Sequence, residues 1–114
     1  MPLTRSFREL VKDRADRDPT FRAALLAEAV ETLLGDDLPT ARILLRDIIN
    51  ATVRFDRLAE ETGLSSKSLM RMFGPEGNPT TRNLLKVVHT LARLEGLRLE
   101  ITAVPATADD VAAE

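Results

Sequence analysis

The stretch that most constrains the fold of this chain is Phe55–Phe73, FDRLAEETGLSSKSLMRMF. Its pattern predicts two short helices joined by a tight turn. Gly63 stands where the turn needs a left-handed residue, and glycine takes a positive φ without steric cost. Ser65 can cap the second helix by accepting a backbone N–H bond, and Leu69 and Met72 then point inward. The stretch therefore predicts a helix-turn-helix over residues 55–73.

The outward face of the second predicted helix is polar and basic. Its residues are Ser66, Lys67, Met70 and Arg71. Short polar and basic side chains near a helix N-terminus suit entry into a DNA major groove, where Lys67 or Arg71 would bond guanine edges. The same hairpin also occurs in helical proteins that do not bind DNA, so a plain helical hairpin stays open as the alternative.

A loop rich in glycine and proline, GPEGNPTTR, follows this helix. Asn78 leads through a proline into Thr80 or Thr81, either of which can cap the next helix. Backbone N–H groups at such a helix start can hold a phosphate. Asn78, Thr80, Thr81 and Arg82 are therefore candidate contacts to a DNA backbone. The alternative is a loop ordered for folding only.

The rest of the chain is predicted to be mostly helical. Asp18 and Asp37, each closely followed by proline, mark the starts of two helices, and Gly35 ends the first of them. One helix precedes Asp18, and RNLLKVVHTLARLEG forms another that Gly96 closes. The residues expected on the inner face of that last helix are Leu84, Leu85, Val88, Leu91 and Ala92. The expected fold class is all-α, with one domain over residues 1–104.

The hydrophobic period changes after the last helix. Leu97–Thr102 alternates apolar and polar residues, which predicts a short half-buried strand. A single strand has unpaired edges, so Leu97, Leu99 and Ile101 are expected to lie at an interface with a twofold mate in a dimer or with another protein's sheet. An extended segment lying on the helices is the alternative.

Composition argues against several kinds of chemistry. The 114 residues include no cysteine and one histidine, so no disulfide, metal site or other cofactor is expected. The acid pairs at 36–37 and 60–61 are adjacent in sequence and do not face one another on a helix, so no enzymatic activity is expected. No apolar run approaches the roughly 20 residues that span a bilayer, and no leader pattern begins the chain; a cytoplasmic location is expected. Residues 105–114 are predicted to form a disordered tail.

Charge is distributed unevenly along the chain. The net charge is −2, yet the stretch from Gly63 to Lys86 holds four basic residues against the single acid Glu76. A local basic patch on a slightly acidic protein suits a binder that discriminates DNA sequence. Ordinary variation in surface charge is the alternative.

A family resemblance rests on three stretches of the chain between Phe7 and Ile101: DPTFRAALLAEAVETLLGDD, LRDIINATVRFDRLAEETGLSSKSLMRMFGPEGNP and TRNLLKVVHTLARLEGLRLEI. Together they resemble the HigA-like, Xre-type helix-turn-helix antitoxins, known as addiction-module antidote proteins. The run SLMRMFGPEGNP is the most specific part. The resemblance implies a lambda-repressor-like helical bundle, here with two extra N-terminal helices and the short C-terminal strand.

The resemblance also implies a function. Such proteins are antitoxins of type II toxin–antitoxin systems that bind a double-stranded DNA operator as homodimers, repress their own operon and neutralise a small RelE/HigB-like toxin. The recognition-helix positions that carry over are Ser65, Ser66, Lys67, Ser68 and Arg71. Met70 departs from the pattern, because polar residues are more usual there. Toxin-contacting residues do not carry over, because no shared motif marks them.

Two other functions stay open at this point. One is a stand-alone transcriptional repressor, from a phage or a chromosome, with no toxin. The other is a protein-interaction module that does not bind DNA, which the overall acidity and the modest basic patch favour.

Overall fold

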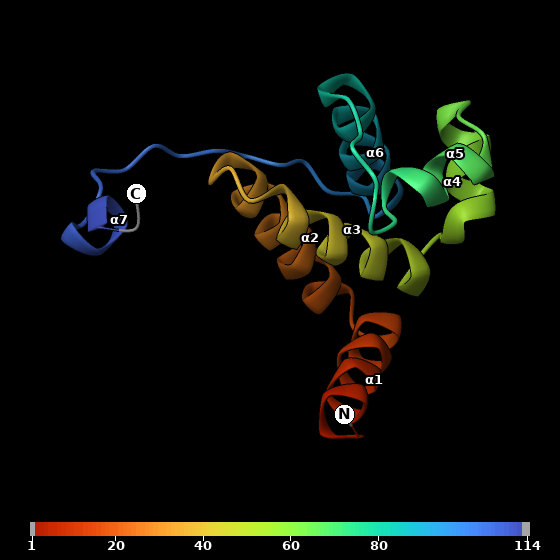
Figure 1. Cartoon of the computed structure of the whole chain (residues 1–114), viewed down its shortest axis with the longest axis horizontal. Helices are drawn as coiled ribbons and strands as arrows, with labels where there is room; N and C mark the ends of the chain where they lie inside the picture. The colour runs from red at the N-terminus through yellow and green to blue at the C-terminus, as the bar shows by residue number, and fades with distance from the viewer. Residues whose placement is uncertain (1, 113–114) are drawn as a thin grey trace.

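A computed structural model describes residues 2–112 of the chain, and the side chains of residues 9–110. Within this range the regular structure is helical throughout, which confirms the all-α expectation (Figure 1). The helices are α1 (Pro2–Arg17), α2 (Pro19–Leu34), α3 (Leu38–Ala51), α4 (Arg54–Thr62), α5 (Ser66–Met72), α6 (Thr81–Leu94) and α7 (Ala108–Ala112).

The starts of α2 and α3 are fixed by the two aspartates that the sequence indicated. Asp18 accepts hydrogen bonds from the backbone N–H groups of Thr20 and Phe21 at 3.0 and 3.3 Å. Asp37 accepts from the N–H of Thr40 at 3.2 Å. Each carboxylate satisfies donors that have no partner within the helix, so the predicted starts are confirmed.

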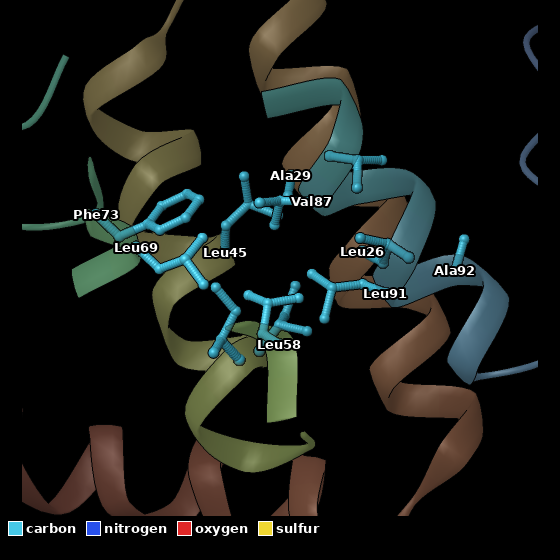
Figure 2. Packing of buried hydrophobic residues seen from close by; sticks show 12 residues of the cluster. Leu26, Ala29, Leu45, Leu58, Leu69, Phe73, Val87, Leu91 and Ala92 are labelled. Atoms are coloured by element: carbon cyan, nitrogen blue, oxygen red, sulfur yellow. The ribbon is translucent and has the colours of Figure 1, made fainter. Parts of the chain in front are cut away.

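The core lies between α2 and α3 on one side and α4, α5 and α6 on the other. α2 and α3 pack against each other, α1 packs on both, and α4 contacts α3, α5 and α6. Figure 2 shows Leu69 and Phe73 beside Leu45 at one end of the cluster and Leu91 beside Leu26 at the other. Because α5 contributes Leu69 to this cluster, its opposite face is held toward solvent.

An ion pair fastens α2 to the end of α6. The guanidinium of Arg22 donates to both oxygens of Glu95, with 3.3 Å between Nη2 and Oε2, and its Nη1 donates to the Ala15 carbonyl of α1 at 3.0 Å. The hydrogen bond to Glu95 raises the pKa of Arg22 above its ordinary value. Arg22 thus ties the ends of α1 and α6 to the start of α2.

The strand expected over Leu97–Thr102 is not formed within the described chain. α6 ends in a Schellman motif, with Gly96 at φ +70° and the N–H of Leu97 bonded to the carbonyl of Ala92 at 2.8 Å. The segment then runs away from α6 toward α7 (Figure 1). A strand needs a neighbouring strand to take its N–H and C=O groups, and residues 2–112 offer only helices.

The tail also differs from expectation, since part of the stretch predicted to be disordered is helical. Ala108–Ala112 forms the short helix α7. Thr107 and Asp110 bond reciprocally at its start, with the Asp110 carboxylate 2.9 Å from the N–H of Thr107 and the Asp110 N–H 3.2 Å from the Thr107 hydroxyl. The N–H and the hydroxyl of Thr107 both donate to the Asp110 carboxylate, and these two bonds lower the pKa of Asp110. Residues 113–114 of the predicted tail lie outside the described residues.

The turn after α2 places strain on a residue that is not glycine. Gly35 has φ −86°, whereas Asp36 adopts φ +62°. Asp36→Gly should raise the free energy of unfolding by about 1 kcal/mol, because it removes the left-handed strain and an anion next to a helix C-terminus. Urea denaturation followed by circular dichroism measures this change. Asp36→Ala is the control: it removes the charge and keeps the strain, so a gain equal to that of Asp36→Gly would contradict the strain explanation.

Candidate nucleic-acid interface

The turn between α4 and α5 is built as the sequence predicts. Gly63 has φ +78°, and its N–H bonds to the carbonyl of Ala59 at 2.9 Å. Thr62 is buried below it and its hydroxyl accepts the N–H of Leu64 at 3.2 Å. A left-handed glycine and one buried hydroxyl therefore fix the direction in which the chain enters α5.

The serines at the start of α5 are occupied by local hydrogen bonds. Ser65 caps the helix: its hydroxyl accepts the Ser68 N–H at 3.0 Å and donates to the Ser68 hydroxyl at 2.8 Å. Ser66 is half-buried and donates to Asp56 of α4 at 3.3 Å. All three serines lie at the start of α5, as the sequence predicts, and the bond between Ser66 and Asp56 links α5 to α4.

The outer face of α5 carries two cations around a methionine. Lys67, Met70 and Arg71 are exposed, and 53% of Met70 is accessible to solvent. Leu69 and Phe73 on the opposite face are almost fully buried. Neither Lys67 nor Arg71 forms an ion pair with any residue of the described chain. Both cations are therefore available to a negatively charged ligand.

An open groove of about 240 Å³ lies between α5 and the loop that follows it. Ser68 and Arg71 line it from α5, and Glu76 and Asn78 line it from the loop. Three of the predicted DNA-contacting residues, Ser68, Arg71 and Asn78, are thus brought together. Glu76 is the one acid in the groove, so its charge partly offsets that of Arg71.

The loop is held against α5 by a close backbone approach. A Cβ atom on Gly77 would lie 2.0 Å from the carbonyl oxygen of Met72, far inside contact distance. From the other side, Arg42 of α3 donates to the carbonyl of Gly77 at 3.1 Å. Together these contacts fix the position of Asn78, the next residue, relative to α5.

The remaining candidates separate into two groups at opposite ends of α6. Thr80 caps this helix by accepting the N–H of Asn83 at 3.1 Å, and the neighbouring Thr81 and Arg82 are exposed. The other group, Leu97, Leu99 and Ile101, follows the last turn of α6. Because α6 has 14 residues, about 21 Å separate its two ends. The structure therefore does not place the predicted strand residues with the basic face.

Sequence patterns did not indicate the roles of some residues that position this interface. Asp56 orients Ser66, Gly77 permits the loop to close, and Arg42 holds that loop from 35 positions away. Gly77 is one of several glycines and prolines in its loop, so composition alone marked the loop and not the residue. No local sequence pattern could indicate the role of Arg42, because its partner Gly77 lies in a distant loop.

Among the described residues, no three or more histidines and carboxylates gather into a set that could hold a metal ion. No helix in residues 2–112 is long and apolar enough to cross a bilayer. Comparisons with protein-family models, with curated proteins and with solved structures found no match to this chain.

Proposed function

We propose that this chain is a sequence-specific DNA-binding protein in which α4 and α5 act as a helix-turn-helix within a lambda-repressor-like bundle. The observation that carries the proposal is the exposed face of α5, where Lys67, Met70 and Arg71 point to solvent while Leu69 anchors the helix in the core. A rigid helix that presents unpaired cations near its start is what insertion into a major groove requires.

Each candidate residue has a role in this proposal. Lys67 and Arg71 bond the O6 and N7 atoms of guanine, and Met70 contacts a thymine methyl group. Residues of the loop and the start of α6 contact phosphates and fix the register on the duplex. These are Asn78, Thr80, Thr81 and Arg82. The serines at the start of α5 make short polar contacts that their hydrogen bonds within the hairpin pre-orient.

The biological role that we propose is that of an antitoxin. Its support is the resemblance of residues 7–101 to HigA-like antidote proteins, which implies a homodimer that represses its own operon and neutralises a small toxin. The proposal includes no enzymatic activity and no cofactor. A stand-alone repressor would use α5 in the same way. Two observations would favour the antitoxin over the stand-alone repressor. One is a small toxin gene beside the gene for this chain, and the other is co-purification of that toxin with this chain.

The DNA proposal is tested by fluorescence anisotropy with the duplex that lies upstream of the gene and with a scrambled duplex, at two salt concentrations. The wild-type protein should prefer the upstream duplex. Lys67→Ala/Arg71→Ala should weaken that binding by at least roughly tenfold, since each guanine contact contributes about 1–3 kcal/mol. A shallower salt dependence in the variant would indicate that either cation also contacts a phosphate.

The matched control is Lys12→Ala/Arg17→Ala, which removes the same two charge types from exposed positions on α1. This helix packs on α2 and α3, away from α5. The control should bind the upstream duplex almost as well as the wild type. Equal binding to both duplexes at both salt concentrations contradicts the proposal. So does a folded Lys67→Ala/Arg71→Ala variant that binds with unchanged affinity, which would favour a protein-interaction module.

A further inference from the structure

An apolar groove along α6 has no role in the proposed DNA contact. Its volume is about 610 Å³. Residues of α6 form one wall and the chain that follows α6 forms the other; the apolar ones are Leu85, Val88, Ala92, Leu97 and Leu99. Leu85 is 62% exposed within it, and Ile101, just beyond it, is 73% exposed. This surface leaves large apolar side chains in water, which marks an interaction site.

The segment beside this groove places alternate side chains together. Arg98 and Glu100 form an ion pair with each other, so these alternate side chains lie on the same side of the backbone. Leu97 and Leu99 line the groove together with Arg98, and they alternate along the backbone with Arg98 and Glu100. Within the described chain, residues 98–101 make no backbone–backbone hydrogen bond. The segment is therefore an unpaired edge with one apolar and one charged face.

We propose that a second copy of this chain occupies the groove, with the two Leu97–Ile101 segments paired as antiparallel strands about a twofold axis at Leu99. Residues directly opposite each other in such a pair share a face. Arg98 then lies opposite the partner's Glu100, and Leu97 lies opposite the partner's Ile101. The second copy therefore carries its exposed isoleucine onto the groove, and the two segments supply each other with hydrogen-bond partners.

The charge pattern selects this arrangement over others. A parallel, in-register pair would set Arg98 against the partner's Arg98 and Glu100 against the partner's Glu100, which is destabilising. A slip of one residue would turn apolar side chains onto the charged face. The segment is thus complementary to itself only when antiparallel in this register. The inference rests on the proposed function in one respect, since it names the interface of the homodimer that the antitoxin role implies. It depends on no DNA contact, so the DNA titration and the association measurement can fail separately.

The test is the association state of the full-length protein, measured by sedimentation over a range of concentrations. The wild type should be a dimer. Arg98→Glu and Glu100→Arg should each weaken dimerisation by roughly tenfold, because both cross-strand pairs then become repulsive. The double variant Arg98→Glu/Glu100→Arg restores both pairs and should dimerise like the wild type. A mixture of the two single variants should form heterodimers, since each supplies the charges that the other lacks.

These outcomes separate the proposed interface from other modes of association. A wild type that stays monomeric overturns the proposal, as does a dimer that both single variants leave intact. Ile101→Asp offers an independent variant: it places a charge on the groove of the mate and should also give monomers. Circular dichroism checks that each variant is folded, which is expected because all three side chains are exposed.

Discussion

Leu69→Ala is expected to lower the free energy of unfolding by about 2–5 kcal/mol, while Met70→Ala, one residue further along α5, changes it by less than about 0.5 kcal/mol. Leu69 is fully buried against the core residues that α3 and α4 provide, so its truncation leaves a cavity. Met70 is 53% exposed and faces away from that core. The two variants thus remove similar volumes from opposite faces of one helix.

The measurement is urea denaturation of both variants and the wild type, combined with the DNA titration. Met70→Ala should keep wild-type stability and lose affinity for the upstream duplex, because the proposed thymine contact is removed. Leu69→Ala should reduce DNA binding only in proportion to the fraction of the protein that is unfolded. Equal destabilisation by the two substitutions would mean that α5 is not oriented as described.

Gly77→Ala is expected to destabilise the protein by about 3 kcal/mol, near the upper end of what overpacking costs. The added methyl group would meet the carbonyl oxygen of Met72 at 2.0 Å, and this neighbour is backbone rather than a flexible side chain. The loop must move away from α5 to make room. That movement also breaks the hydrogen bond from Arg42 and shifts Asn78, so DNA affinity should fall as well.

Gly35→Ala is the matched control for this substitution. Gly35 has φ −86°, and a Cβ atom there would meet its nearest neighbour at an ordinary 3.5 Å. Alanine should therefore be neutral or stabilising by up to about 1 kcal/mol, through reduced freedom of the unfolded chain. Thermal or urea denaturation of the two variants measures the difference. Similar stability of Gly77→Ala and Gly35→Ala would show that the loop does not pack on α5 this closely.

The helix ends and the central turn could be predicted because their causes are local. Asp18, Ser65 and Thr80 each cap a helix through a bond to a backbone N–H two or three residues away. Gly63 adopts the positive φ that the turn requires. Such interactions are contained in a few consecutive residues, so the sequence specifies them directly.

Which edge of an apolar stripe faces the core was less predictable. Leu85 is expected inside, yet it is 62% exposed, and Val87, two residues further on, is fully buried. The periodicity of α6 allows either edge, because its apolar residues cover a wide arc of the helix. The packing of α6 on α2 and α4 decides the orientation, and that packing depends on residues far away in sequence.

The sequence by itself determined the helical class, the caps, the left-handed turn and the basic outer face of α5, since each follows from neighbours along the chain. The tertiary structure decided which other parts of the chain these elements contact. The loop after α5 packs on that helix through Gly77 and Arg42. Leu97–Thr102 has no neighbouring strand within the described residues, although its alternating pattern predicts one. The physical reason is that pairing and close packing join residues distant in sequence, whereas periodicity records only the geometry of one segment.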